Sequence, residues 1–214
     1  MSLCDVFVFL DDVQFKKNEW QNRNRIKTAQ GEQYLTVPVH YKFPQKINEV
    51  GIDDATDWPK KHLASLGMNY SRAPFYREFI TPVEQIIGQS WKNLAELNAA
   101  LTLEIAGALD IRCKILTSSQ MAVTGESTDR LISICKAVGA DTYLSGSGGK
   151  GYLNEDTFRE NSVKLVYQEF HHPVHAQVSF KSNKEFLPNL AIVDLLFNCG
   201  KESGKILKAG GRLT

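Results

Sequence analysis

The second half of the sequence alternates short apolar runs with amphipathic helical ones, and this alternation restricts the fold more than any other feature. Strand-like runs occupy residues 112–117, 141–145 and 163–168, and helical periodicity occupies residues 128–138 and 154–160. Strands and helices that follow one another through short links build parallel sheets with helices on their faces. We therefore predict an α/β fold with a mainly parallel, Rossmann-like sheet and helices on both faces.

The first half of the chain adds a buried strand and a helical stretch. Residues 5–10 are almost continuously apolar and end before two carboxylates, which is typical of a strand inside a parallel sheet. Between residues 58 and 108 the periodicity becomes helical, and the longest helix is predicted over residues 93–108, where apolar residues recur at spacings of three and four. We predict one domain over residues 1–214, with residues 58–108 as a helical insertion.

Three further segments contain short elements. Residues 33–40 alternate in polarity but contain Pro38, which favours an edge strand. Residues 48–53 are a short strand or a turn, and residues 186–198 are an apolar closing helix. No regular element is assigned to the polar, basic residues 14–30.

Composition excludes several classes of protein. Lys and Arg total 25 against 24 for Asp and Glu, so a net charge of +1 gives no overall field that would attract nucleic acid or a membrane. No apolar run approaches the roughly 20 residues of a spanning helix, and no charged-then-apolar leader opens the sequence. Four scattered cysteines without a C-x-x-C pair are typical of reduced thiols. We expect a cytoplasmic protein with no metal site, no nucleic-acid partner and no membrane partner.

A glycine-rich loop at residues 146–151 follows the strand at 141–145. Its backbone N–H groups and the Lys150 ammonium suit a phosphate or a carboxylate. The loop also matches the G-x-G-x-x-G pattern of dinucleotide sites, but the next helix is too short for a normal crossover. A Walker A loop is excluded because Gly151 stands where Ser or Thr is required. A plain surface turn is the structural alternative. The predicted anion-binding residues are Ser145, Gly146, Gly148, Gly149, Lys150 and Tyr152.

The run from Trp20 to Arg25 combines an aromatic ring, amides and guanidinium groups within six residues. Arg offers paired donors to phosphate, so this composition suits an anionic or sugar ligand. A solvated loop is the structural alternative, and one basic stretch is too little to predict nucleic-acid binding. The candidate substrate-binding residues are Gln14, Gln21, Asn22, Arg23 and Arg25.

Asp11 and Asp12 follow the end of a strand, where ligands bind in open parallel sheets. Neighbouring residues of a strand point to opposite faces, so at most one of the two can face a crevice. Asp11 and Asp12 are therefore candidate catalytic residues, with a turn or capping role as the alternative.

Three histidines, His171, His172 and His175, lie within five residues. A metal site is disfavoured because no cysteine lies nearby, whereas a histidine at a strand end suits general acid–base catalysis. His172 is the catalytic candidate, and His171 and the helical His62 are further candidates.

The sequence resembles the WbqC-like family along nearly its whole length. The resemblance rests on ten segments in family order: residues 5–15, 20–27, 35–39, 61–62, 69–70, 73–74, 143–149, 152–153, 170–177 and 194–200. It implies a protein of bacterial surface-polysaccharide (O-antigen) gene clusters. Transfer of an acyl or aminoacyl group to an amino sugar is the reaction conjectured for this family.

Two departures from the family pattern affect these expectations. Family members begin with a segment like His-Gln-Pro-x-Tyr-x-Pro-Trp-x-Gly-Tyr-Phe ahead of the strand at residues 5–10, and we expect this chain to lack it. With that segment, the order of elements would resemble the class I nucleotidylyltransferase fold, an analogy at fold level only. The family also favours Tyr at His175, so no role is carried to that residue.

The resemblance and the residues together predict an enzyme of surface-polysaccharide or nucleotide-sugar biosynthesis that acts on an amino sugar. Its small-molecule partner is expected to be a nucleotide or a nucleotide sugar. The sequence identifies no cofactor, and it leaves a homo-oligomer open. A non-catalytic ligand-binding or partner-binding protein of the same pathway is the first alternative, and a dinucleotide-dependent oxidoreductase is the second.

Overall fold

A computed structural model describes residues 1–213, and the chain divides into two compact units. The first unit contains Met1–Leu10, Arg112–His171 and Leu207–Thr214. The second unit contains Asp11–Ile111 and His172–Ile206. Each unit has its own cluster of buried apolar side chains.

The first unit contains two small sheets. β1 (Val6–Phe9) pairs in parallel with β6 (Lys114–Thr117). β7 (Thr142–Gly146) pairs in parallel with β8 (Lys164–Phe170), and β9 (Gly211–Leu213) adds to β8 in the antiparallel direction. The predicted strand–helix alternation is therefore present in this unit.

Short helices connect these strands: η2 (Ser118–Gln120), α4 (Ser127–Val138), η3 (Ser147–Gly151) and α5 (Glu155–Glu160). α4 ends where Gly139 adopts a φ of 71°, a left-handed conformation that glycine tolerates without strain. The buried core of the unit consists of Leu131, Ile132, Cys135, Leu153, Phe158, Val163 and Tyr167.

The strands of the second unit are all antiparallel. β2 (Arg23–Thr28) and β3 (Gly31–Thr36) form a hairpin, and β4 (Val39–His40) pairs with β5 (Gly51–Ile52). η1 (Ile47–Glu49) lies between β4 and β5 in the chain.

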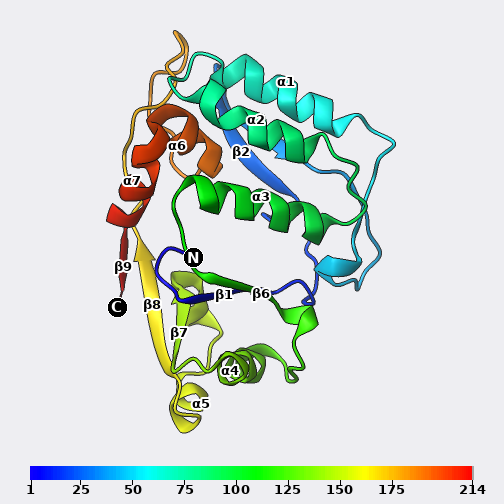
Figure 1. Ribbon diagram of the computed structural model, residues 1–214, viewed down its shortest axis with the longest axis vertical. Helices are drawn as coiled ribbons and strands as arrows, with labels where there is room; N and C mark the ends of the chain where they lie inside the picture. Colours follow the sequence, from blue (N-terminus) through cyan, green and yellow to red (C-terminus); the bar gives the residue numbers. More distant parts are fainter. Residues whose placement is uncertain (214) are drawn as a thin grey trace. The chain divides into compact units, whose positions relative to one another are not determined.

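Helices make up the rest of the second unit: α1 (Trp58–Tyr70), α2 (Tyr76–Ile87), α3 (Leu94–Ala108), α6 (Ile192–Cys199) and η4 (Gly200–Glu202). α1, α2 and α3 lie side by side (Figure 1). The side chain of Asn93 starts α3 by accepting hydrogen bonds from the N–H groups of Ala95 and Glu96. α7 (Ser203–Ala209) follows η4. The core includes Phe15, Ile26, Val50, Trp58, Leu66, Tyr70, Leu94, Leu97 and Phe197.

The structure confirms a mixed α/β protein but not the predicted continuous sheet. Within residues 1–213 the strands form four small sheets, and only the β1–β6 and β7–β8 pairings are parallel. The unassigned basic stretch contributes β2, which pairs with the next strand through a tight turn. The helices predicted between residues 58 and 108 are present as α1 to α3. No helix among the described residues is long and apolar enough to cross a membrane.

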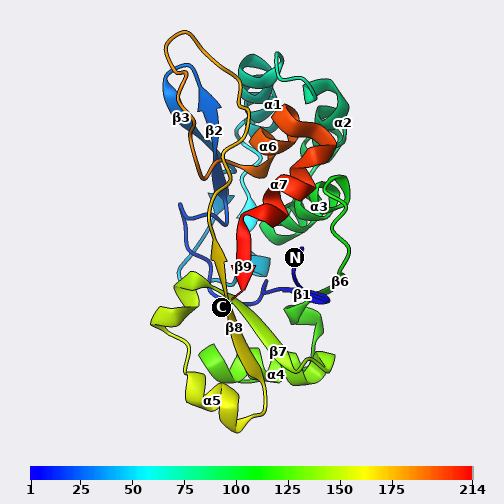
Figure 2. The same ribbon diagram turned by 90° about the vertical axis from the view of Figure 1, so that its left-hand side faces the viewer.

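The predicted closing helix begins later than expected, at Ile192 rather than residue 186. Pro188 and the positive φ of Asn189 (59°) interrupt helical geometry just before it. Residues 172–191 therefore form an extended segment without helix or strand, which we call the strap. The strap passes along β2 (Figure 2). Asn183 of the strap donates to the carbonyl of Thr28 at the end of β2 (3.0 Å).

Candidate functional site

The glycine-rich segment of the first unit is a compact helical turn rather than an open loop. β7 ends at Gly146, and η3 follows at once. A Cβ atom on the buried Gly149 would collide with the Ser145 hydroxyl oxygen and lie 2.9 Å from Leu153. The Ser145 hydroxyl is itself buried and donates to the carbonyl of Gly146 (3.0 Å). The fixed backbone of this turn lies at the carboxyl end of a parallel strand, where α/β sheets bind ligands.

Lys150 carries an ammonium group at this turn that solvent can reach. Its Nζ lies 3.6 Å from Oε1 of Glu169 and 5.3 Å from the ring centre of Tyr167, and half of its side chain is exposed. Tyr152, the next aromatic residue, is also exposed. The turn therefore offers one cation to an anionic ligand, partly neutralised by Glu169.

The dinucleotide alternative receives no support from the helix after this turn. α5 has six residues, and the Asn154 side chain caps it by accepting a hydrogen bond from the N–H of Thr157 (3.2 Å). This short helix is unlike the long crossover helix whose N-terminus holds the pyrophosphate in a dinucleotide site.

Three basic residues of β2 form a row on one face of the β2–β3 hairpin. Arg23, Arg25 and Lys27 alternate along β2 and therefore point to the same face. Their partners across the hairpin are Thr36, Tyr34 and Glu32, respectively. We call Arg23, Arg25 and Lys27 the cationic row.

Several predicted substrate-binding side chains are committed to the protein itself. Asn22 is almost fully buried, donates to the carbonyl of Val37 (3.1 Å) and accepts from the N–H of Asn18 (3.0 Å). Gln21 accepts from the N–H of Lys16 (2.8 Å). These amides stabilise the loop before β2.

Arg25 is likewise held by internal partners. It donates to Glu32 Oε2 (2.6 Å) and to the carbonyl of Asn189 (3.1 Å), and it lies 5.1 Å from the ring centre of Trp20. Gln14, the remaining candidate, is exposed and forms an isolated bridge with Lys46. Arg25 therefore joins the hairpin to the strap.

Arg23 differs from Arg25. Its guanidinium lies 4.4 Å from the ring centre of Tyr34, and it makes no hydrogen bond or ion pair with any of residues 1–213. The rings of Tyr34 and Trp20 are 46% and 59% exposed. The Arg23 end of the row therefore presents a cation stacked on the exposed ring of Tyr34, and the exposed ring of Trp20 lies against the next arginine, Arg25.

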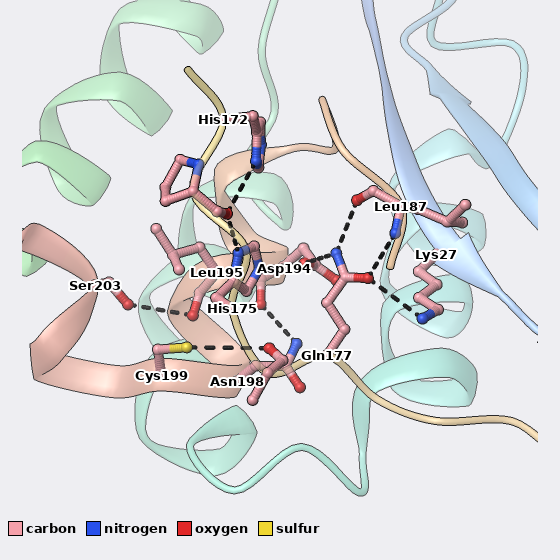
Figure 3. Close-up of polar contacts among 12 residues, drawn as sticks. Lys27, His172, His175, Gln177, Leu187, Asp194, Leu195, Asn198, Cys199 and Ser203 are labelled. Carbon is pink, nitrogen blue, oxygen red and sulfur yellow. Dashed lines mark hydrogen bonds and ion pairs between the residues drawn. The ribbon is translucent and has the colours of Figure 1, made fainter. Parts of the chain in front are cut away.

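At the other end of the row, a buried polar network centres on Asp194 in the first turn of α6 (Figure 3). The Tyr70 hydroxyl donates to Asp194 Oδ1 (3.0 Å), and the Gln177 amide donates to Oδ2 (2.8 Å). His175 Nε2 lies 2.9 Å from the same Oδ2, and the side chains of His175 and Asp194 are 3% and 2% exposed. The carboxylate is therefore fully satisfied by three donors from distant parts of the unit.

Gln177 connects this carboxylate to Lys27, as Figure 3 shows. The Lys27 ammonium donates to the carbonyl of Glu185 (2.6 Å) and to Gln177 Oε1 (3.3 Å). Burial lowers the pKa of Lys27 below its usual value, and the charge of Asp194 acts in the opposite direction. Burial also raises the pKa of Tyr70 far above its usual value, so its hydroxyl stays a donor.

The imidazole of His175 lies between two hydrogen-bond acceptors. Nδ1 lies 3.2 Å from the carbonyl oxygen of Pro173, and Nε2 faces Asp194. A carboxylate only accepts hydrogen bonds, so Nε2 is the donor in the contact with Asp194. His175 and Asp194 are therefore a buried hydrogen-bonded pair, and removal of one partner leaves a buried polar group unsatisfied.

The predicted proton-transfer candidates occupy different surroundings. Asp11 accepts from the side chain of Asn48 (3.3 Å), and its carbonyl accepts from the N–H of Asn48 (2.8 Å), so it joins two distant segments. Asp12 follows it and is half-buried. The ring centre of His172 lies 6.0 Å from that of His175. The exposed His171 belongs to the first unit.

His62 is a core histidine. Its Nε2 donates to the carbonyl of Thr36 (3.0 Å), and its ring packs against Trp58 (centroids 5.1 Å apart). Burial lowers the pKa of His62, so the ring is neutral and carries its proton on Nε2. Within residues 1–213 no group of three His, Cys, Asp or Glu could hold a metal ion.

Sequence reasoning did not identify the buried network. Lys27 was one basic residue among several, and His175 received no role. Yet all five members lie in segments that carry the family resemblance: Lys27, Tyr70, His175, Gln177 and Asp194.

Comparison with known proteins agrees with that resemblance. The model of the WbqC-like protein family matches residues 1–206. Uncharacterized protein Rv1507c of Mycobacterium tuberculosis (strain ATCC 25618 / H37Rv) is 35% identical over an alignment of 215 positions. The alignment covers 97% of this chain and 90% of that protein. No solved structure matches the chain. The chain belongs to the WbqC-like protein family.

Proposed function

We propose that this protein is an enzyme of bacterial surface-polysaccharide (O-antigen) or nucleotide-sugar biosynthesis that transfers an acyl or aminoacyl group to an amino sugar. Family membership supports the biosynthetic context. The observation that carries the proposal is the rigid turn after β7, with the solvent-reachable ammonium of Lys150. This turn would hold a phosphate of the nucleotide.

The geometry of the turn supports the proposed phosphate role. A phosphate near Lys150 would replace or share the contact with Glu169, which at 3.6 Å is a weak ion pair. Gly149 keeps the backbone close to Ser145 because no larger residue fits there. The proposed phosphate-binding residues are Ser145, Gly146, Gly148, Gly149, Lys150 and Tyr152.

Acyl transfer to an amine also needs a proton acceptor. The attacking nitrogen must lose a proton as the new amide bond forms, and an imidazole is the side chain best suited to accept it near neutral pH. We assign this role to His172, whose ring is stacked on that of His175 with 6.0 Å between the ring centres. Asp12 and Asp11 are the carboxylate alternatives.

A thermal-shift panel tests the proposal. It would contain nucleotides, nucleotide sugars and acyl-coenzyme A. A ligand at 100 times its Kd adds about 2.7 kcal/mol to the free energy of unfolding, which raises Tm by roughly 5–10 °C at this chain length. Lys150→Gln should abolish the shift by a nucleotide sugar, whereas Lys164→Gln, at an exposed position on β8, should keep it. A panel in which no compound moves Tm would contradict the proposal.

The burial of the polar network favours a second candidate, a non-catalytic binding protein of the same pathway. Lys27 and Asp194 are each 1% exposed, which suits a structural role better than contact with substrate. Release of free coenzyme A thiol from acyl-coenzyme A and a nucleotide-linked amino sugar separates the two candidates. Turnover that His172→Ala abolishes supports the enzyme; ligand binding without any thiol release supports the binding protein.

A further inference from the structure

We propose that the Arg23 end of the hairpin face is a binding site for an anionic sugar, a hexose ring that carries a phosphate or a carboxylate. The proposal deepens the proposed function by naming the class of sugar. It rests on residues of the second unit alone, which the nucleotide test of Lys150 does not involve.

Arg25 is an arginine of this face whose guanidinium is held by partners within the protein. Its guanidinium has a carboxylate 2.6 Å away, a backbone carbonyl 3.1 Å away and an aromatic ring beneath it. Arg23 lies two residues earlier on the same face and has only the aromatic contact. Its five N–H donors are therefore available, in a planar fork that matches two oxygens of a phosphate or a carboxylate.

The Arg23 fork is already ordered. Its guanidinium stacks on the ring of Tyr34, which lies diagonally across the hairpin, since Arg23 pairs with Thr36 and Arg25 with Tyr34. A ligand that binds there does not have to immobilise a free side chain, which reduces the entropic cost of binding.

The charges on this face favour an anion. Glu32 is held by Arg25, and Asp194 is held by Tyr70, Gln177 and His175. These two carboxylates therefore have stronger partners than Arg23. The strap contacts the other two residues of the row: Arg25 donates to the carbonyl of Asn189, and Lys27 donates to the carbonyl of Glu185. The Arg23 end is therefore the open one.

The exposed rings indicate a ligand with a ring of its own. Tyr34 leaves about half of its surface in water, on a hairpin that Ile26 anchors in the core, and Trp20, just before the hairpin, is exposed to a similar extent. Aromatic faces at such positions stack on the apolar face of a sugar. A sugar that bears an anion uses the ring and the fork together, whereas neutral glucose or inorganic phosphate uses only one of them.

Calorimetric titration of the full chain with four probes tests this inference. The probes are glucose 1-phosphate, glucuronate, glucose and inorganic phosphate. We expect one or both sugar anions to bind at least about tenfold more tightly than glucose and phosphate, because they alone engage both features. The first two probes distinguish a phosphate-bearing from a carboxylate-bearing sugar.

Variants assign the binding to Arg23. Arg23→Gln should weaken the sugar anion about tenfold or more, and Tyr34→Ala should weaken it several-fold. Arg72→Gln removes the same charge from an exposed turn of the same unit and should change nothing. The Trp20 ring centre lies 5.1 Å from the guanidinium of Arg25, the next residue of the row, so quenching of tryptophan fluorescence is an independent readout.

Three outcomes would overturn the inference: no binding by any probe, equal binding of glucose and the sugar anions, or equal effects of Arg23→Gln and Arg72→Gln. Lys150→Gln should leave the affinity for glucuronate, which carries no phosphate, unchanged. Arg23-dependent binding without any nucleotide shift would retain this site and reject the transferase proposal. A nucleotide shift without sugar-anion binding would do the reverse.

Discussion

Two lysines in this protein lie near carboxylates, and their surroundings give them different roles. Lys150 of the first unit is half-exposed and 3.6 Å from Glu169. Lys27 of the second unit is buried, donates at 2.6 Å to a carbonyl and reaches Asp194 through Gln177. Solvent screens the first pair, so it contributes little to stability and is available to a ligand. The second belongs to a desolvated network, where every lost partner leaves a buried charge or dipole unpaired.

Asp194→Asn should produce the largest effect, because it removes a buried carboxylate that accepts from Tyr70, Gln177 and His175 and whose charge acts on the Lys27 ammonium. We expect a loss of about 3–5 kcal/mol in the free energy of unfolding. Asp54→Asn breaks an exposed pair with Lys92 in the same unit and should cost no more than about 1 kcal/mol. Urea unfolding followed by tryptophan fluorescence measures both, because Trp20, Trp58 and Trp91 all belong to the second unit. Equally small losses in the two variants would show that the buried network does not stabilise the fold.

Gly149→Ala tests whether the turn of the first unit is as rigid as its geometry indicates. The added Cβ would collide with the Ser145 hydroxyl, and we expect a loss of about 1–3 kcal/mol. At Gly148 a Cβ meets nothing within 4 Å, so Gly148→Ala is the matched control, expected within about 0.5 kcal/mol. Thermal unfolding by circular dichroism measures both variants. Equal stabilities would indicate that the turn rearranges.

Lys27→Met should change how stability depends on alkaline pH. The pKa of Lys27 is lowered in the folded protein, so between that value and 10.5 the unfolded chain binds more protons, and stability rises with pH. Lys27→Met removes this rise. Lys92→Met, at an exposed position, should retain it. Urea midpoints between pH 7 and 10 provide the test, and a rise that persists in Lys27→Met would assign it to another group.

His62→Gln should have the smallest effect, visible only in acid. Burial lowers the pKa of His62 in the folded protein. Between pH 6.5 and that lowered value the unfolded chain binds more protons, so the free energy of unfolding decreases as the pH is lowered. The variant should lose this fall, whereas His40→Gln, whose side chain is 73% exposed, should keep it. An unchanged acid slope in His62→Gln would exclude His62 as its source.

The parts of the fold that local sequence encodes were predicted closely. Residues 93–108 were expected as a helix and form α3 over Leu94–Ala108, because the apolar spacing and the Asn93 cap are local signals. Residues 128–138 were likewise expected as a helix and form α4 over Ser127–Val138, which Gly139 ends. Neither signal depends on the rest of the chain.

The errors occurred where contacts outweigh local pattern. β2 was missed because it is mostly polar, and its place depends on pairing with β3 and on cover from Tyr70 and the strap. The strap was predicted in part as helix from its apolar content, but Pro188 and Asn189 prevent that geometry. The continuous parallel sheet was inferred from alternation alone, which does not specify which strands pair.

The candidate site also combines features that local sequence specifies with features that only tertiary contacts specify. The sequence by itself determined the helices, the mixed α/β class, the family and the residue types available for anion binding. Only the tertiary structure decided which of them are available: Arg25 is paired with Glu32, Arg23 is not, and Lys27 is buried. The physical reason is distance along the chain. Helical periodicity and capping act within a few residues, whereas burial and charge pairing join groups as far apart as Lys27 and Gln177, or Tyr70 and Asp194.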